Sequence, residues 1–313
     1  MNRHHSIYVA GGNTPIGAVI LRALRNAGYG GAFGDGGEDL RDINQVEALF
    51  RERKPEFVFL AAGKTGGIVA NINYPADLML DNLLTNCNVI DCAHRHGVKK
   101  LLYLASSCSY PRDCAQPISE KALLTGMLEP TNESYAVAKI AGIKLCQAYR
   151  LQYGSNFIAG IPANAYGPDD DFSEESSHVV AALIRKMHEA KINHRKQVEI
   201  WGTGNPQREF IFMDDLADAC LFIMDHYDEM EPINVGSGTT LSIRNLAETV
   251  REVVAFNGEI TYDTSKPDGM PVKSLDSGKL RDLGWSPHVS FREGLAMMYD
   301  AYRKSYHEST EAN

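Results

Sequence analysis

Two short runs contain residue types that can move protons at a carbonyl group. One is Ser106-Ser-Cys-Ser-Tyr-Pro111, and the other, Tyr135-Ala-Val-Ala-Lys139, is a Tyr-x-x-x-Lys pattern within a helical stretch. Residues four apart lie on one helix face, so we expect the Lys139 ammonium group beside the Tyr135 hydroxyl. A nearby cation lowers the pKa of a phenol from about 10 toward neutrality. With the Ser106 hydroxyl holding a substrate oxygen, this set suits transfer of hydride and a proton across a C–O bond.

The pattern alone is more typical of an exposed amphipathic pair on a helix surface, and Cys108 alone is more typical of a buried inert thiol. The context favours chemistry. The run from Lys100 to Ala105 is typical of a buried strand, and Ser106 and Cys108 follow its C-terminal end. Ligands bind at the carboxyl ends of strands in open α/β sheets. Because Ser106 and Cys108 are two apart, they would face the same side if the extended geometry continued.

A glycine-rich turn near the N-terminus predicts a dinucleotide site. A β-rich run, Ser6 to Ala10, leads into Gly11-Gly-Asn-Thr-Pro-Ile-Gly17 and then a helical pattern that ends near Gly28. Backbone N–H groups and a helix N-terminus in this order can bind a pyrophosphate. The alternative is a glycine-rich turn without a ligand. A nucleotide triphosphatase loop would need Lys after Gly17, where the chain has Ala18.

Strand-like and helix-like segments alternate through about residue 168. The expected helices include 45–53, 78–96 and the one carrying Tyr135, with Asn132 as its N-cap; the expected strands include 56–62 and 156–161. We therefore predict an α/β fold with a doubly wound parallel sheet and a smaller, interrupted C-terminal lobe. The predicted division assigns 1–168 and 209–237 to the dinucleotide-binding domain, and 169–208 and 238–313 to the lobe. Three stretches, 169–175, 206–212 and 265–276, are expected to be irregular.

Composition favours a soluble cytoplasmic enzyme. The 313 residues carry a net charge of −9, which argues against a general nucleic-acid binder. No apolar run approaches 18 residues, and the first strand begins too early for a signal peptide, so neither a membrane span nor export is expected. None of the six cysteines forms a Cys-x-x-Cys pair, so we expect neither a metal site nor a disulfide framework.

Beyond these patterns, the chain resembles the extended short-chain dehydrogenase/reductase family over nearly its whole length. Tyr-x-x-x-Lys is shared widely in that family. Ser106-Ser-Cys108 together with Lys139-Ile-Ala-Gly-Ile-Lys-Leu-Cys146 is narrower, and resembles the GDP-L-fucose synthase branch. Ala61 to Asn71, Leu128 to Glu133, Trp201 to Gly204, Arg208 to Phe210 and Ser265-Lys-Pro-Asp-Gly269 carry the same resemblance.

The resemblance implies NADP(H)-dependent 3,5-epimerisation and 4-reduction of GDP-4-keto-6-deoxy-D-mannose to GDP-L-fucose. By similarity, Cys108 and His178 form the acid–base pair that inverts C3 and C5. Ser106 and Tyr135 would hold the C4 oxygen, and Lys139 would keep Tyr135 poised and hold the nicotinamide ribose. The family typically forms a homodimer through two long helices, here near 78–96 and 134–153.

The resemblance also implies binding residues. Those for the cofactor are Gly11, Gly12, Asn13, Thr14, Pro15, Ile16, Gly17, Asp39, Leu40, Leu104, Ala105, Ser106, Ser107, Lys139, Pro162, Ala163, Asn164, Ala165 and His178. Those for the GDP-linked 4-keto sugar are Lys186, Trp201, Arg208 and Asp276. From sequence alone, a surface position is nearly as typical for His178. Trp201 is more typical of a core or interface position, and Lys186 and Arg208 are more typical of solvated positions.

Several positions depart from that family pattern. Asn13 and Asp35 stand where basic residues usually meet the NADP 2′-phosphate; Val272 replaces another basic residue, and Lys186 replaces an Arg. An acidic residue after the second strand suits the free 2′-OH of NAD. We therefore expect weak discrimination between NADPH and NADH, with NADH use favoured, unless Arg41 folds back toward the phosphate. The alternatives are an enzyme for another nucleotide-linked 4-keto sugar, or a non-catalytic dinucleotide sensor, which should lack an intact Tyr/Lys pair.

Overall fold

The computed structural model describes residues 1–174, 176–266 and 268–311. Glu175 and Pro267, each inside a stretch discussed above, lie outside the described residues. The predicted α/β fold with a doubly wound parallel sheet is confirmed. Six parallel strands are arranged in the order β2-β1-β3-β4-β5-β9. They are β1 Ile7–Ala10, β2 Ala32–Gly34, β3 Phe57–Leu60, β4 Lys100–Leu104, β5 Phe157–Pro162 and β9 Ile233–Val235.

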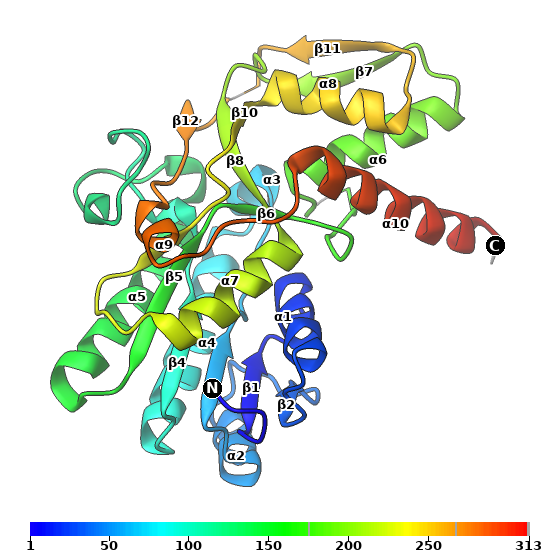
Figure 1. Ribbon diagram of the computed structural model, residues 1–313. Coiled ribbons are helices and arrows are strands. Elements are labelled where there is room, and N and C mark those ends of the chain that lie inside the picture. Colours follow the sequence, from blue (N-terminus) through cyan, green and yellow to red (C-terminus); the bar gives the residue numbers. More distant parts are fainter. Residues whose placement is uncertain (175, 267, 312–313) are drawn as a thin grey trace.

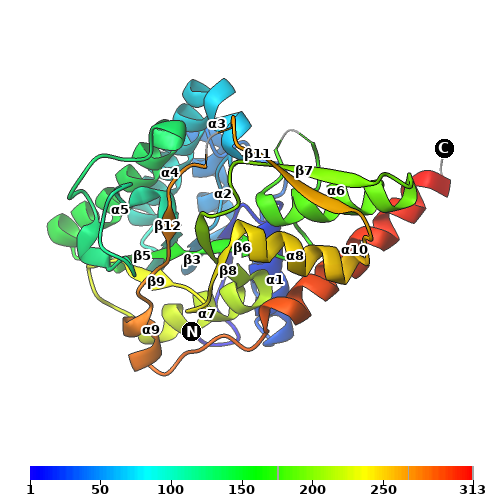
Figure 2. The ribbon, with the colours of Figure 1, turned by 90° about the horizontal axis from the view of Figure 1, so that it is seen from above.

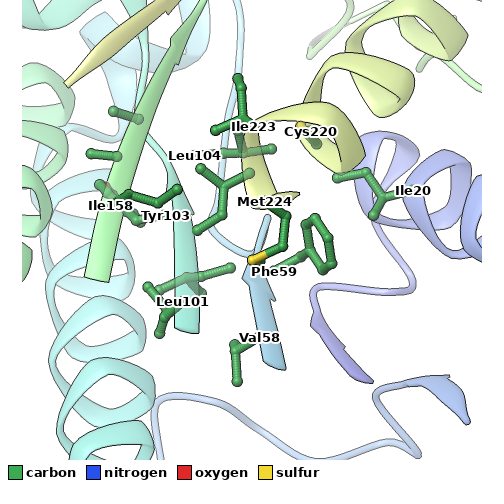
Figure 3. Packing of buried hydrophobic residues seen from close by; sticks show 14 of the residues in the cluster. Ile20, Val58, Phe59, Leu101, Tyr103, Leu104, Ile158, Cys220, Ile223 and Met224 are labelled. Carbon is green, nitrogen blue, oxygen red and sulfur yellow. The ribbon is translucent and has the colours of Figure 1, made fainter. Parts of the chain in front are cut away.

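Helices cover both faces of this sheet, which explains the near-continuous apolar strands. Every residue of β4 and β5 is buried. On one face α1 (Pro15–Asn26) packs beside α7 (Met213–His226), and on the other α5 (Glu133–Tyr153) packs along α4 (Pro75–Arg95), which also meets α2 (Ile43–Arg53). Figure 3 shows Ile223 and Met224 of α7 lying against Phe59 and Leu104 of the sheet.

Capping chemistry explains where the predicted helix bounds were wrong. Helix α2 begins two residues earlier than expected, because the side chain of Asp42 caps it by accepting from the backbone N–H of Asn44. Helix α4 begins at Pro75, a residue favoured in a first helical turn. Asn132 stands at the N-cap position of α5, as predicted, but its side chain caps nothing.

The smaller lobe is built around a second sheet, β10-β8-β12, with β6 also paired to β8, and a two-stranded β11-β7 unit. In Figure 2, which looks onto the carboxyl ends of the central strands, β6 and β8 overlie the sheet and α6, α8 and α10 extend to one side. The elements are β6 Asn164–Tyr166, α6 Val179–Ile192, β7 Gln197–Trp201, β8 Gln207–Phe212, β10 Thr240–Ser242, α8 Ile243–Val254, β11 Glu259–Asp263, β12 Val272–Lys273 and α10 Phe291–Glu311. Short helices are α3 Ile68–Asn73, α9 Gly278–Asp282 and the 3₁₀ turns Ser107–Ser109, Glu120–Ala122 and Pro130–Asn132.

The expectation of irregular structure over 206–212 was wrong, because β8 occupies Gln207–Phe212. Its last four residues are buried, and Pro206 lies just before the strand, where a missing N–H costs no ladder bond.

The buried apolar side chains form two hydrophobic clusters, and the division into a dinucleotide-binding domain and a smaller lobe stays a prediction. One cluster surrounds the central sheet, and the other joins α6, α8 and α10 with β7 and β8. Met270, Leu275, Leu280 and Trp285 pack in the first cluster, although the proposed boundaries place them in the smaller lobe. No helix in the described part of the chain is both long and apolar enough to cross a membrane.

Candidate active site

The glycine turn after β1 is closed so tightly that only glycine fits. Gly11 has a φ of +86°, and a Cβ there would lie 2.6 Å from the backbone of Ala62. A Cβ on Gly17 would lie 1.9 Å from the carbonyl oxygen of Gly11. Thr14 caps α1, accepting from the Gly17 N–H and donating to the Gly11 carbonyl. Pro15 and Ile16 begin the helix, so the N-terminus of α1 lies at the carboxyl end of β1, as a pyrophosphate site requires.

Asp35, directly after β2, is tied to this turn. Its carboxylate accepts from the Tyr8 hydroxyl at 2.6 Å and from the Gly11 N–H at 2.8 Å. Burial raises the pKa of Asp35, although these bonds and one from the Gly12 N–H oppose the rise. An acidic group is therefore held at the place where a Rossmann-type site meets the adenosine ribose.

A cavity of about 220 Å³ opens beside the turn and carries more negative than positive charge. Its lining is Gly11, Asn13, Thr14, Asp35, Glu38, Asp39, Leu40, Arg41, Ala62, Gly63, Lys64, Asp81 and Thr85. Arg41 does not turn toward Asn13: its guanidinium pairs with Asp39 at 2.8 Å and Asp81 at 3.2 Å. Lys64 lies 3.8 Å from Asp81. Both cations are thus matched by carboxylates, which leaves the cavity acidic. A neighbouring cavity of equal volume, lined by Phe33 and Arg53, contains no predicted catalytic residue.

Ser106, Cys108 and Tyr135 meet at the carboxyl end of β4. The side chains of Ser106 and Cys108 would share a strand face only if the extended geometry continued past Ser106, and it does not. The chain instead enters a 3₁₀ turn at Ser107, and the Cys108 N–H donates to the Ser106 hydroxyl at 3.2 Å. The Ser106 hydroxyl also lowers the pKa of the Cys108 thiol and of the Tyr135 phenol, so it lies beside both groups. A turn rather than a strand therefore brings the three groups together.

Lys139 does not lower the pKa of Tyr135 as expected. Its ammonium donates to the Leu104 carbonyl at 3.2 Å and lies 5.7 Å from the centre of the Tyr135 ring. Burial, together with the charge of Cys108, raises the pKa of Tyr135, against the bond from Ser106. Burial also lowers the pKa of Lys139 to about 8. Tyr135 is therefore held protonated, as a proton donor must be.

The Cys108 sulfur lies among hydrogen-bond donors. The Asn132 side-chain amide donates to it at 3.2 Å, and the Lys273 ammonium lies at 3.5 Å. Burial by itself raises the pKa of the thiol, but Lys273, Ser106 and Arg208 together outweigh it, so the pKa falls below its ordinary value. A thiol in such surroundings can act as a base near neutrality.

His178 comes directly before α6 and faces the same cation. Its side chain remains accessible to solvent, yet enough protein surrounds it to lower the imidazole pKa. Lys273 lowers this pKa further and Asp171 opposes it. Lys273 thus lowers the pKa of both members of the proposed acid–base pair, Cys108 and His178.

The predicted substrate residues separate into two groups. Arg208 lies close enough to act electrostatically on Cys108 and Asp268. Trp201 is 47% exposed, with the Lys266 ammonium 5.3 Å from its ring, and Lys186 donates to the Glu199 carbonyl at 3.4 Å. Those three belong to the lobe that faces the thiol.

Asp276 contacts a different set of residues. Its carboxylate accepts from the Gly278 N–H at 2.9 Å, and its backbone bonds Ile118 and Asn234. Asp268 is nearer to Trp201, because its carboxylate accepts from the Thr203 N–H at 2.7 Å and hydroxyl at 2.8 Å.

The strand-end segment expected at the nicotinamide crosses from β5 into β6. Pro162 ends β5, Ala163 is buried, and Asn164 begins β6 with its amide donating to the Glu209 carbonyl at 3.1 Å. Leu104 and Ala105 lie at the parallel end of β4, so the two predicted segments are neighbours in the sheet.

Sequence reasoning missed Lys273 and the role of Asn132. Lys273 lies on a two-residue strand with no periodic pattern, and only its pairing with β8 brings it to the thiol. Asn132 was interpreted as a cap because it precedes a helix. Among the described residues no group of three or more His, Cys, Asp or Glu side chains is placed to hold a metal ion, and all six cysteines are free.

Comparison with known proteins gives a consistent result. Residues 7–236 match the sequence model of the NAD dependent epimerase/dehydratase family. GDP-L-fucose synthase 1 of Arabidopsis thaliana is 53% identical over 96% of this chain and 93% of that protein. Among solved structures, a GDP-6-OMe-4-keto-L-xylo-heptose reductase from C. jejuni has a TM-score of 0.93 at 33% identity, over 97% of this chain and 99% of the other. A GDP-L-fucose synthetase from Naegleria fowleri bound to NADP has a TM-score of 0.89 at 28% identity, over 98% and 95%.

Proposed function

The chain belongs to the NAD dependent epimerase/dehydratase family, and from this premise we propose that it converts GDP-4-keto-6-deoxy-D-mannose to GDP-L-fucose. The reaction inverts C3 and C5 and then reduces C4. One observation carries the proposal: the Ser106 hydroxyl, which accepts from the Cys108 N–H at 3.2 Å, lies beside both the Cys108 thiol and the Tyr135 phenol and lowers the pKa of each. The thiol, which suits proton removal, and the phenol, which suits proton donation, therefore lie beside one hydroxyl that can hold a substrate oxygen.

Epimerisation depends on the keto group already present at C4. The carbonyl acidifies the protons on C3 and C5, so a base can remove each one and leave an enolate. Cys108 and His178 form the pair that removes a proton and returns one to the opposite face. Ser106 and Tyr135 donate hydrogen bonds to the C4 oxygen, where the enolate charge develops.

Reduction uses the same oxygen. A bound nicotinamide dinucleotide supplies the hydride that C4 receives. Tyr135, kept protonated by burial, gives its proton to the C4 oxygen. Lys139, buried under that ring, positions the phenol and offers its ammonium group to the nicotinamide ribose. The glycine turn suits a pyrophosphate because it leads into the N-terminus of α1, and it needs glycine because a Cβ at Gly11, Gly12 or Gly17 would collide with backbone.

We propose further that the enzyme discriminates only weakly between NADH and NADPH. A 2′-phosphate carries close to two negative charges and needs cationic partners. The cavity at the turn is lined by Asp35, Glu38, Asp39 and Asp81, and its two cations are already paired. Titration of NADH and NADPH, followed by nicotinamide fluorescence, tests this without turnover. A preference for NADPH above about 100-fold, or about 2.7 kcal/mol, would overturn it.

Two substitutions separate the proposed roles. Cys108→Ser should stop or severely slow C3 and C5 exchange and leave the reductive set intact. Tyr135→Phe should reduce turnover by about 10²–10⁴-fold, as expected for loss of a general acid, while exchange continues. Each variant is incubated with the keto sugar in deuterated water, and deuterium uptake is read by NMR. Normal exchange by Cys108→Ser would remove Cys108 from the mechanism.

We also propose a cytoplasmic homodimer formed through α4 and α5. Both helices carry exposed apolar side chains, namely Leu80, Leu84, Val137 and Leu151. Light scattering of the purified protein tests the dimer, and Leu84→Glu should shift it toward monomer. A wild-type mass of one chain would exclude it.

A further inference from the structure

The Cys108 thiol is held by donors from two other elements. Its sulfur lies 3.2 Å from the Asn132 amide nitrogen, just before α5, and 3.5 Å from the Lys273 ammonium on β12. Both groups are donors in this contact, so the sulfur must accept from both. A thiolate accepts such bonds far better than a neutral thiol does.

Lys273 has no competing partner in the part of the chain that the structure describes. None of the ion pairs found there includes it, and its single hydrogen bond goes to the Cys108 sulfur. An ammonium group normally ends on a carboxylate or in solvent. A lysine that instead ends on a half-buried sulfur has its charge directed at that atom.

The backbone that delivers Lys273 is firmly fixed. Lys273 pairs in parallel with Arg208 of β8. Two residues further on, the N–H of Leu275 donates to the buried Glu209 carboxylate at 2.6 Å, and Leu275 is itself buried. The N–H of Ile118 donates to the Ser274 carbonyl at 2.8 Å. The contact with the thiol is therefore built into the sheet, not made by a loose side chain.

From this arrangement we propose that Lys273, assisted by Asn132, is a positioning residue that keeps Cys108 as a thiolate ready to take a proton from carbon. The proposal rests on the acid–base role proposed above for Cys108. In the proton transfer the substrate C–H bond breaks, its electron pair moves to the C4 oxygen as an enolate, and an S–H bond forms. Reprotonation from the opposite face restores the carbon.

The charges around the sulfur agree with this role. Arg208 on β8 adds to Lys273 in lowering the thiol pKa, and burial opposes both. The negative charge of the thiolate also acts on Lys139 and Tyr135 of α5 and raises the pKa of each. His178 faces Lys273 from the start of α6. The side chains named here that interact electrostatically with the sulfur are thus cations and hydroxyls.

The test measures the thiol itself, without substrate. Alkylation by iodoacetamide is followed from pH 5 to 10, with mass spectrometry of the Cys108 peptide, in wild type, Lys273→Met, Lys273→Arg and Asn132→Ala. Partly exposed Cys114, which lies outside α4 and α5, is the internal reference. Lys279→Met is the matched control, since it removes a lysine that pairs with Glu231.

Wild-type Cys108 should react at lower pH than Cys114. An opposite charge within about 4–6 Å moves a pKa by about 1–3, so Lys273→Met should slow alkylation of Cys108 near neutral pH by at least about tenfold. Lys273→Arg should restore much of the rate, Asn132→Ala should lose part of it, and Lys279→Met should change nothing. Unchanged Cys108 profiles in both Lys273→Met and Asn132→Ala, with Cys114 unaltered, would overturn the proposal. If turnover were nevertheless lost, Lys273 would serve the substrate diphosphate instead, and the proposed reaction would stand.

Discussion

Replacing Gly17 with Ala tests whether the glycine turn is held by close packing of α1 on the turn. The added Cβ would lie 1.9 Å from the Gly11 carbonyl oxygen and 2.6 Å from its carbon, both backbone atoms. Relief requires a shift of about 1 Å, and the helix cannot move freely, because Val19, Ile20 and Leu24 are buried against the sheet.

Overpacking of this kind costs about 1–3 kcal/mol, and a clash with backbone belongs at or above the upper end. With a urea m-value of about 3 kcal/mol per molar, the unfolding midpoint should fall by about 1 M. Dinucleotide affinity should fall as well, because the shift moves the N–H groups of the turn. Circular dichroism in urea and nicotinamide fluorescence measure the two effects.

Gly30→Ala is the matched control. Gly30 is exposed, has no neighbour within 4 Å of an added Cβ, and does not need a left-handed φ. That variant should be neutral or more stable by about 0.4–1 kcal/mol, through the entropy of the unfolded chain. Equal midpoints and equal dinucleotide affinities for the two variants would refute the packing argument.

Two further predictions concern buried carboxyl groups. Burial raises the pKa of Asp170 from 3.8 to about 7, so the folded protein holds this proton more tightly than the unfolded chain does, and the free energy of unfolding falls as pH rises through that window. Asp170→Asn should therefore raise the urea midpoint at pH 8 but not at pH 4. A pH-independent difference between the variant and wild type would contradict this. Glu209 accepts from the Leu275 N–H at 2.6 Å and the Gly238 N–H at 2.7 Å. Glu209→Gln sets an amide N–H against one of these donors, so it should lower the free energy of unfolding by about 1–3 kcal/mol and speed amide hydrogen exchange at 272–278. Unchanged exchange there would show that another group fixes β12.

Local patterns predicted the central sheet and most of the residues around it. The apolar runs at Lys100–Leu104 and Phe157–Pro162 are strands because both faces are covered, and the turn from Gly11 to Gly17 is recognisable from spacing alone. Ser106 and Tyr135 could be placed together because Ser106 follows the carboxyl end of β4 and Tyr135 lies near the start of α5.

Contacts between distant segments could not be predicted in this way. Lys273 reaches Cys108 across 165 residues through a two-residue strand, and no periodicity marks so short an element. The expected effect of Lys139 on Tyr135 was wrong because helical spacing sets which face a residue occupies, not where its side chain ends. Here the ammonium group turns to the Leu104 carbonyl instead.

The most direct test of the central claim is the isotopic composition of the product. Wild-type enzyme is incubated in deuterated water with GDP-4-keto-6-deoxy-D-mannose and reduced dinucleotide, and the product is identified by NMR and mass spectrometry. The proposed function predicts GDP-L-fucose with deuterium at both C3 and C5 and hydrogen from the dinucleotide at C4. A C4-reduced sugar without deuterium at C3 and C5 would show a reductase without epimerase activity, and dinucleotide binding without turnover would contradict the proposed catalysis.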